Sequence, residues 1–575
     1  MRTWRTTSIF LAMPVSPVAG LLAVAALGVP FVFLLLHQRA PQLMTGVRAL
    51  LAWRRRGERT ADMTSAAAYH TRLHDAVQAG TLNERTWKDL DLDDVFCSLD
   101  YTESEPGRQY LYHLLRTPQF SEEPLQRRER LVRCLAGDPE LTERIQTPLR
   151  RLQHPRAGQL VHLVLGELPR RPGYWLLFPI LTVTSATSLI AFLTIWPPAF
   201  VIWLAVCLTN LWVQLFYRSR VKRFVPAIRE LPAFIGVGRA LGALHIPEAR
   251  EETEALRDGA KRLAGLRGAA TWLRFDPGEG GELAASLYEY INLLFLLDVN
   301  AFVFTIEKLR ASQPTMRQLF ESIGYLDAMQ SVTRWRAILP AWTTPDFVPP
   351  GKVLRSEALY HPLLLHPVPN SLETDGASVL ITGSNMSGKT TFVRTLGVNA
   401  VLAQTLHTVC ADEWSAPLMH VRTSIGRADS ITEGKSYYLA ELESIAALVH
   451  AKTDGAQYLF LLDEIFRGTN TIERVASGFA VLSYLNRGTD IVVVATHDIE
   501  MIDLLGDRYV TRHFREEFID SHMTFDYRLH DGPSSSRNAI ALLDVAKLPG
   551  DLVADAVAAL DWQSRRRTNP AALGD

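Results

Sequence analysis

The sequence predicts a mixed fold: an α/β domain at the C-terminal side, an all-α domain split into two halves, and transmembrane helices. Three observations carry this prediction. Long uncharged apolar stretches occur near the N-terminus and around residue 195. The segments flanking the second stretch have apolar residues at the mixed spacing of 3 and 4 that is typical of helices. From about residue 346 onward, short β-branched runs alternate with helical segments, which is typical of a mainly parallel sheet.

Composition narrows the class of protein. The chain has 575 residues, enough for about three or four domains. Hydrophobic residues make up 47% and charged residues 21%, which excludes a disordered chain. The net charge is -1 and does not indicate a nucleic-acid-binding protein, although a local basic patch remains open. The four cysteines form no C-x-x-C pair, which excludes a zinc ribbon and a disulfide scaffold and fits a reducing compartment.

The first apolar stretch predicts an N-terminal transmembrane anchor at residues 1–38. Thr6–Gln38 has no Asp, Glu, Lys or Arg. Val18–Leu36, at 1.5 Å per residue, spans about 28 Å, close to the hydrocarbon core of a bilayer. A cleaved signal peptide is the alternative, but the apolar run is long and its most hydrophobic part comes last. Whether this stretch crosses once or forms a tighter hairpin stays open.

The second apolar stretch predicts a transmembrane hairpin at residues 172–217. It has no formal charge and is interrupted by Trp196-Pro197-Pro198. Two spans fit, Tyr174–Ile195 and Ala199–Phe216, with aromatic residues towards their ends. A pair of buried core helices is the alternative, but a globular core rarely needs so long a run without charge.

The flanking charges predict the orientation. Arginines follow the first span, in a basic juxtamembrane linker at 39–89 that includes Arg54–Arg56, and Arg or Lys flank both ends of the hairpin. The positive-inside rule places these flanks in the cytoplasm, so the soluble parts face the cytoplasm at a bacterial-type inner membrane. Arg54–Arg56 as a nucleic-acid patch is the alternative. The basic tail at 561–575 is expected to be a solvated end.

The remaining segments predict the soluble domains. The helical domain has a first half at 90–171, with a break expected at Pro106-Gly107, and a second half at 218–345, with an interruption at Asp276–Gly281. The Pro-rich segment Thr343–Pro350 marks a boundary. The α/β domain then spans 346–560.

A phosphate-binding loop is predicted at the start of the α/β domain. Ser378–Thr382 is a strand candidate, and the chain then matches G-x-x-x-x-G-K-[ST] before a predicted helix at Thr391–Leu402. Glycines let backbone N–H groups turn towards phosphate oxygens, Lys389 supplies a point charge for the β- and γ-phosphates, and Thr390 a hydroxyl for Mg²⁺. The predicted ATP-binding residues are Gly383, Ser384, Asn385, Met386, Ser387, Gly388, Lys389, Thr390 and Thr391.

Two further buried strands predict catalytic side chains. Tyr458–Leu462 is followed by two carboxylates, of which Asp463 suits Mg²⁺ and Glu464 suits polarisation of the attacking water. Ile491–Ala495 is followed by His497, which can sense the γ-phosphate or orient water. The predicted catalytic residues are Glu464, His497 and Lys389, and the predicted metal ligands are Thr390 and Asp463.

These motifs resemble the ATPase domain of the MutS mismatch-repair family over residues ~350–555. The strings that carry the resemblance are Ile381–Arg394, Ser424–Glu441, Leu461–Asn470, Ala495–Asp498, Thr524–Leu529 and Ala546–Pro549. Weaker likeness extends upstream to the start and end of the family's helical core, at Leu99–Leu115, Tyr325–Val332 and His361-Pro362. The core is then split around the hydrophobic hairpin, where the mismatch-repair proteins carry a DNA clamp.

The resemblance implies an ATPase that works as a dimer, expected to be a homodimer. Ser436 of one subunit would complete the ATP site of the other, and DNA and the lipid bilayer are candidate partners. Ser384 and Thr390 stand where the family usually has Pro and Ser. We find no counterpart of the mismatch-reading domain, so the chain resembles a membrane-anchored variant without it.

The expected function is ATP hydrolysis coupled to DNA binding in a mismatch-repair-like role at the membrane. The alternative is an ATP-driven motor acting on membrane helices or a membrane partner without DNA. An ABC transporter fits poorly, because no Leu-Ser-Gly-Gly-Gln string precedes Asp463.

Overall fold

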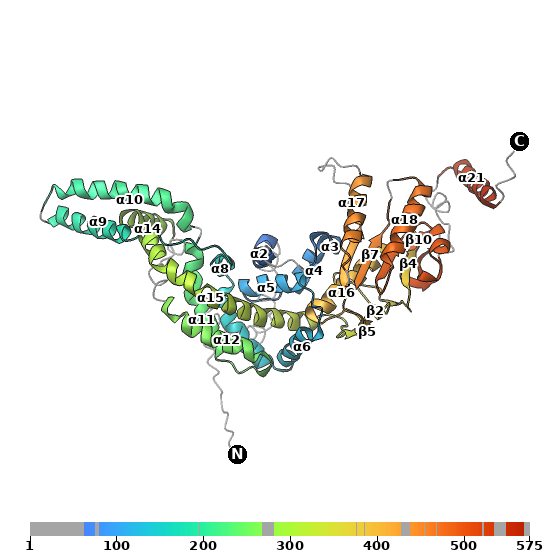
Figure 1. Ribbon diagram of the computed structural model, residues 1–575, viewed down its shortest axis with the longest axis horizontal. Helices are drawn as coiled ribbons and strands as arrows, with labels where there is room; N and C mark the ends of the chain where they lie inside the picture. The colour runs from blue at the N-terminus through green and yellow to red at the C-terminus, as the bar shows by residue number, and fades with distance from the viewer. Residues whose placement is uncertain are drawn as a thin grey trace, which may run out of the picture. The chain divides into compact units, whose positions relative to one another are not determined.

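The computed structural model divides the chain into two units, Met1–Met63 and Thr64–Asp575. The residues that it describes are 62–74, 80–194, 196–222, 224–266, 281–374, 376–384, 386–426, 437–453, 455–466, 469–519, 522–533 and 548–568. The predicted anchor at 1–38 and Arg54–Arg56 lie outside the described residues. The architecture below is that of the second unit, in which helices come first and strands follow (Figure 1).

The part before the strands is helical, as predicted. Its α-helices are α2 (Met63–His74), α3 (Glu84–Asp89), α4 (Leu92–Leu99), α5 (Glu105–Arg116), α6 (Glu122–Gly137), α7 (Pro139–Leu149), α8 (Leu160–Val164), α9 (Leu177–Thr194), α10 (Ala199–Lys222), α11 (Val225–Gly242), α12 (Arg250–Arg262), α14 (Gly281–Phe295) and α15 (Leu297–Arg336). Helices α2 and α3 lie inside the stretch expected to be a linker, 39–89, and bury Tyr69 and Trp87 in the core. The helical part therefore starts before residue 90.

The break expected at Pro106-Gly107 is wrong, because both residues lie in the first turn of α5. Proline is tolerated there, because the N–H groups in the first turn of a helix have no partner within the helix, and proline lacks only this group. The Ser104 side chain caps this helix by accepting a hydrogen bond from the Gly107 N–H at 3.1 Å. The chain breaks instead between α4 and α5.

Helices α5 and α15 are joined by a buried carboxylate. Asp327 of α15 is fully buried and accepts hydrogen bonds from the Ser104 hydroxyl at 2.5 Å, the Ser104 N–H at 2.8 Å and the Glu103 N–H at 2.9 Å. A fourth comes from Gln330, also on α15, at 2.8 Å. A buried carboxylate is tolerated only when donors satisfy it, so these bonds fix the start of α5 against α15.

Helices α9 and α10 form the predicted hairpin and lie side by side (Figure 1). The segments Leu177–Thr194 and Ala199–Tyr217 are long and apolar enough to cross a membrane, and each is only 17% buried within the protein. Helices α14 and α15 also pass this test as a pair, bent by 66° at Leu296. The sequence predicts helix through this region but not the bend.

The C-terminal part is an α/β domain, as predicted. Its strands are β1 (Asp346–Phe347), β2 (Arg355–Leu359), β3 (Asn370–Glu373), β4 (Ser378–Thr382), β5 (Glu413–Ala416), β6 (His420–Ile425), β7 (Tyr458–Asp463), β8 (Ile491–Ala495), β9 (Tyr509–Ile519) and β10 (His522–Asp531). Its helices are α16 (Lys389–Leu406), α17 (Tyr437–His450), α18 (Thr471–Leu485), α19 (Glu500–Leu505) and α21 (Gly550–Thr568). The main sheet has the order β10-β9-β4-β8-β7-β6, parallel except for β10, and a smaller sheet has the order β1-β5-β2-β3.

Helices cover both faces of the main sheet, because its central strands are apolar on both sides. Phe460 and Leu462 belong to the cluster that buries residues of α17, α18 and α19. Leu461 points the other way, and a Cβ on Gly397 of α16 would lie 2.6 Å from its side chain. Close approach of α16 to β7 therefore requires a glycine at 397.

A buried ion pair links the helical part to the α/β domain. Arg336, at the end of α15, pairs with Glu129 of α6 at 2.7 Å and donates to the Thr408 hydroxyl at 2.9 Å and the His407 carbonyl at 2.8 Å. Burial opposes ionisation of Glu129, but His407 and Arg336 outweigh it and lower the pKa of Glu129 to about 2. Asp89 of α3 adds a second link by accepting a hydrogen bond from Thr423 at 2.8 Å.

Candidate active site

The three predicted motifs meet at one edge of the main sheet. Strands β4, β8 and β7 are adjacent and parallel, and each is followed by one of the motifs. The carboxyl ends of parallel strands share an edge, which is where ligands bind in open α/β sheets. Ser378–Thr382 and Ile491–Ala495 are strands with the predicted bounds, and the predicted Tyr458–Leu462 extends by one residue to Asp463.

The glycine-rich loop after β4 needs glycines at both ends. Gly383 has φ +139°, and a Cβ there would lie 2.5 Å from the Phe514 carbonyl oxygen. Gly388 has φ +109° and is the N-cap of α16. Both conformations are rare for residues with a side chain. Met386, at the tip of the loop, has φ +71° and is 81% exposed.

Lys389 lies over this loop. Its ammonium donates hydrogen bonds to the carbonyls of Gly383 at 2.8 Å and Ser384 at 2.6 Å, and the side chain is buried. Nζ also lies 3.4 Å from His497 Nε2. The predicted cation therefore stands at the N-terminus of α16, whose dipole already favours an anion.

The Thr390 hydroxyl and the two acidic residues at the end of β7, Asp463 and Glu464, also lie in this site. Thr390 donates a hydrogen bond to Asp463 Oδ2 at 2.7 Å, and Asp463 is buried. Glu464 follows with φ +48°, and its N–H donates to the Ala495 carbonyl at 2.9 Å. Its Oε1 lies 2.8 Å from His497 Nε2. Since a carboxylate only accepts hydrogen bonds, this contact favours the tautomer in which Nε2 carries the proton.

The remaining predicted residues are only partly described. Ser387 closes the loop by donating to the Ser384 carbonyl at 2.9 Å. Thr391 lies in the first turn of α16 and lines a neighbouring cavity. Asn385 and Ser436 lie outside the described residues.

The structure adds site residues that sequence reasoning missed. The Ser384 hydroxyl donates to Glu516 Oε2 at 2.6 Å, which ties the loop to β9. Asp498 receives three hydrogen bonds from Arg474 of α18, at 2.6 to 3.2 Å. No motif marks Glu516 or Arg474, because their role depends on which strand and helix lie beside the loop. The sequence feature that could have indicated a cationic partner here is Asp498, which follows His497 directly.

A cavity of about 260 Å³ adjoins the loop. Gly388 and Thr391 form one wall, and His361, Phe392 and Tyr527 are among its other lining residues. Burial, with a smaller contribution from Arg394, lowers the pKa of His361 to about 4, so its ring is neutral at pH 7. A mostly apolar cavity with neutral rings beside a phosphate-binding loop suits a flat heterocycle.

The donor set fits a hard divalent cation held mainly by its ligand's oxygens. The described residues contain no group of three or more His, Cys, Asp or Glu side chains placed to hold a metal. The Thr390 hydroxyl and the Asp463 carboxylate are oxygen donors, and Mg²⁺ typically uses one or two protein oxygens together with phosphate and water.

Comparison with known proteins agrees with this site. Residues 379–562 match the family model described as MutS domain V. The DNA mismatch repair protein MutS of Thermus thermophilus is 30% identical over 298 residues, which covers 51% of this chain and 36% of that protein. The MutS of Pseudothermotoga lettingae is 32% identical over 254 residues, covering 42% of this chain and 31% of that protein. The chain thus spans about a third of the length of these curated relatives. The likeness to the MutS family therefore lies in the C-terminal domain, where residues 379–562 match MutS domain V.

Proposed function

We propose that this chain is a Mg²⁺-dependent ATPase whose site is a P-loop. The observation that carries the proposal is the convergence of Lys389, Thr390, Asp463, Glu464 and His497 at one sheet edge. Family members are ATPases, and the convergence supplies each group that phosphoryl transfer from ATP to water needs. The loop N–H groups and Lys389 would bind the β- and γ-phosphates, and the cavity beside His361 would take the adenine.

Each side chain has a defined task in this reaction. Glu464 accepts a hydrogen bond from the attacking water and orients it towards the γ-phosphate, and His497 holds the Glu464 carboxylate in place. Thr390 and Asp463 would hold Mg²⁺, which supplies positive charge for the phosphate oxygens. Lys389 stabilises the charge that develops on those oxygens.

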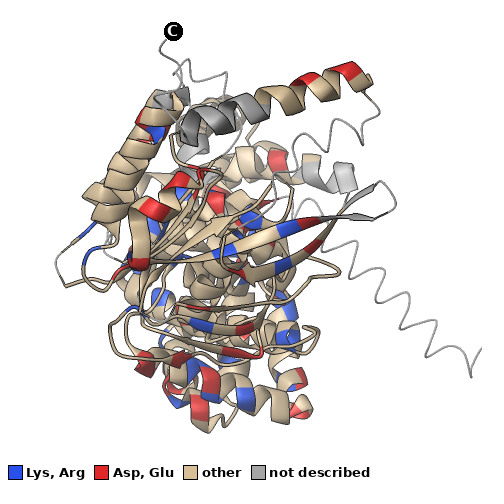
Figure 2. Ribbon diagram, turned by 90° about the vertical axis from the view of Figure 1, so that its right-hand side faces the viewer, with Lys and Arg blue, Asp and Glu red and all other residues tan. Residues whose placement is uncertain are grey.

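The proposed working unit is a homodimer that closes on ATP, with Ser436 of one subunit completing the site of the other. The relatives are named for DNA mismatch repair, which supports DNA as a partner. The charge distribution does not select DNA, because Lys and Arg are interspersed with Asp and Glu on the face shown in Figure 2.

The path of α15 favours a second way in which ATP hydrolysis could be used, namely movement of the hairpin. This helix has 40 residues. It begins at the bend beside the α9–α10 hairpin and ends at Arg336, which is bonded to Thr408 of the α/β domain. A continuous helix can transmit a displacement of one end to the other, so ATP-driven closure would move the hairpin. We propose that the hairpin lies in a bacterial inner membrane with the α/β domain in the cytoplasm.

ATP turnover by the detergent-purified protein tests both outputs. It would be measured with and without homoduplex, mismatched and branched DNA, at several salt concentrations, with Glu464→Gln as the blank. Stimulation by DNA that declines with salt supports the DNA output, because phosphate contacts release counterions. Turnover indifferent to every DNA supports the membrane motor. Absence of turnover above the blank overturns the proposed ATPase.

A further inference from the structure

A large cavity lies at the base of the hairpin, away from the ATP site. Its volume is about 960 Å³, and its walls come from α9 and the segment before it, the end of α14, the start of α15 and Gly265. This is near the upper end of the ~300–1,000 Å³ common for ligand pockets. Pro179, Val183, Phe295, Leu297, Ala301 and Phe304 supply its apolar surface.

The Thr182 hydroxyl and the Asn300 amide nitrogen in its wall have partners within the protein, whereas Asn300 Oδ1 is buried without one. Thr182 donates a hydrogen bond to the Phe295 carbonyl at 2.7 Å and accepts one from Asn300 Nδ2 at 2.8 Å. Asn300 also donates to the Leu296 carbonyl at 3.0 Å. The bond from Thr182 gives the Phe295 carbonyl a partner at the bend, while the Leu296 carbonyl also accepts the Asn300 backbone N–H at 2.9 Å. Most of the other lining residues are apolar, so the wall favours an apolar occupant.

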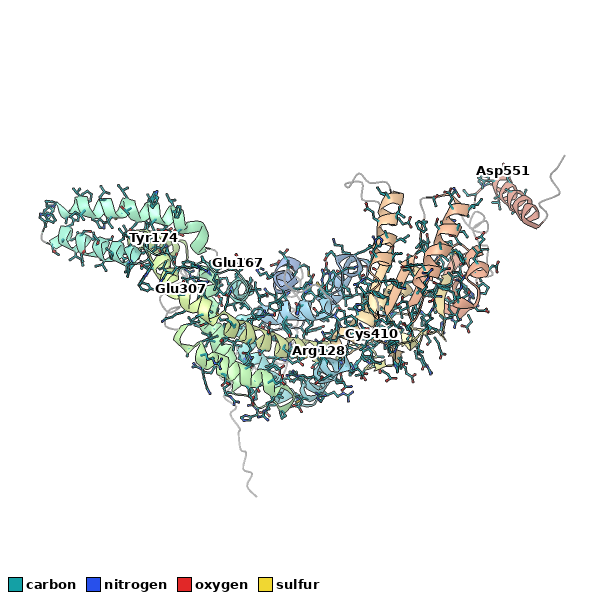
Figure 3. The ribbon with its side chains drawn as sticks, viewed as in Figure 1. Arg128, Glu167, Tyr174, Glu307, Cys410 and Asp551 are labelled. Atoms are coloured by element: carbon teal, nitrogen blue, oxygen red, sulfur yellow. The ribbon has the colours of Figure 1, made fainter. Side chains whose placement is uncertain are left out.

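Basic side chains line the same cavity. Arg171 and Lys308 are both lining residues. The Arg171 guanidinium lies 4.1 Å from the centre of the Trp175 ring, which in turn packs edge-on against Phe304 at 5.5 Å. Glu307, the acidic residue that precedes Lys308 on α15, is labelled in Figure 3. Glu307 accepts a hydrogen bond from the Arg171 backbone N–H at 3.0 Å and pairs with Arg310 at 3.6 Å.

We propose that this cavity binds an anionic phospholipid, with an acyl chain along the apolar wall and the phosphate against Arg171 and Lys308. An apolar cavity with a basic rim beside helices that can span a membrane matches both halves of such a lipid. The Trp175 ring next to Arg171 is the residue type that lies at headgroup level. Inorganic phosphate would leave the apolar wall exposed to water, and an uncharged lipid would leave the rim without a partner. The inference rests on the membrane placement proposed above.

Native mass spectrometry of the full-length protein tests the proposal. Protein in detergent would be equilibrated with equal amounts of phosphatidylglycerol and phosphatidylcholine, and the retained lipid counted. We expect preferential retention of phosphatidylglycerol. Arg171→Gln combined with Lys308→Gln should reduce it roughly 10- to 30-fold, from two basic contacts with an anionic headgroup. Arg170→Gln is the matched control, because Arg170 is exposed and not among the lining residues, and it should retain the lipid.

Two further measurements separate the outcomes. Ala301→Phe narrows the cavity without changing its charge and should lower retention of the whole lipid, whereas added inorganic phosphate should not displace it. Equal retention of both lipids by the wild type, or undiminished retention by the double variant, overturns the lipid site. Membrane fractionation of the same protein reports separately on the hairpin. A protein that partitions with membranes but does not select phosphatidylglycerol refutes only the cavity's role.

Discussion

Glu464 and His497 lie side by side across the ends of two neighbouring strands, with 2.8 Å between Oε1 and Nε2. The Glu464 backbone adopts φ +48°, a conformation that costs about 1 kcal/mol or more for a residue with a side chain. Its N–H is bonded to the Ala495 carbonyl of the adjacent strand, which holds this conformation. The strained backbone thus turns the carboxylate towards the imidazole, so the two groups act as one unit.

Glu464→Gln should bind ATP and turn it over at least ~100-fold more slowly, the scale of removing a positioned base. The amide has nearly the same shape, so the loop and the His497 position should be retained. Phosphate release and nucleotide binding would be measured on the same preparation. Glu473→Gln is the control, since Glu473 lies exposed in the first turn of α18. Normal turnover by the Glu464 variant would refute the base assignment.

Lys389→Ala should abolish ATP binding. The ammonium that bridges the Gly383 and Ser384 carbonyls is the one cation this loop directs at the β- and γ-phosphates among the described residues. Binding of a fluorescent ATP analogue gives the readout. Lys452→Ala provides the comparison, because Lys452 pairs with Asp490 at 2.5 Å, at the opposite end of β8. Wild-type affinity in the Lys389 variant would contradict the P-loop proposal.

The strands and loop of the site could be predicted from the sequence because their signals are local. Each of β4, β7 and β8 is a short, mainly apolar run that is buried on both faces, and a polar residue ends the strand or follows it directly. The glycine-rich loop joins one of them to a helix in the order that its chemistry requires. The long-range partners carry no such signal. The contact of Ser384 with Glu516 spans 132 positions and depends on β9 lying beside β4.

In the helical part, too, the local features could be predicted from the sequence and the long-range contacts could not. Its helical character follows from apolar spacing, but the sharp bend at Leu296 has no glycine or proline to mark it. Pro314, a residue that usually ends or kinks helices, lies inside α15. Asp327 is an ordinary acidic residue in the sequence, and only the packing of α5 against α15 makes it a buried acceptor of four hydrogen bonds.

Gly107→Ala should destabilise the helical part, because a Cβ there would lie 2.1 Å from Asp327 Oδ2 and 2.6 Å from its Cβ. The whole Asp327 side chain would have to move, so α5 and α15 must separate. Overpacking of this kind costs ~1–3 kcal/mol. Thermal unfolding in detergent measures the loss. Gly137→Ala, at the exposed end of α6, meets no atom within 4 Å and should cause none. Equal unfolding temperatures for the Gly107 and Gly137 variants would show that α5 and α15 can separate without loss of stability.

The stability that Asp327 contributes should depend on pH. Burial, opposed by its hydrogen bonds, raises the pKa of Asp327 from 3.8 to about 6. Between these values the folded state binds the proton and the unfolded state does not, so this contribution grows as pH falls from 6 towards 4 and is lost as pH rises through 6. The stability gap between the wild type and Asp327→Asn should therefore widen on acidification, by about 1 kcal/mol per pH unit. Denaturant unfolding at pH 5 and 7 tests this. Asp258→Asn, at an exposed position, should show no such trend, and a gap that narrows would reverse the sign of the shift.

Thr182→Val should loosen the hairpin from the bend between α14 and α15. Valine keeps the shape of threonine but removes the hydroxyl that donates to the Phe295 carbonyl and accepts from Asn300. Hydrogen bonds between helices in an apolar setting contribute ~0.5–2 kcal/mol, so the variant should unfold at a lower temperature. Its ATP binding should be unchanged, because the ATP site lies in the α/β domain. Thr187→Val is the control, since the Thr187 hydroxyl donates only to carbonyls of its own helix among the described residues. If the two valine variants lose the same stability, the bend is not held by α9 and the hairpin is free to move without α15.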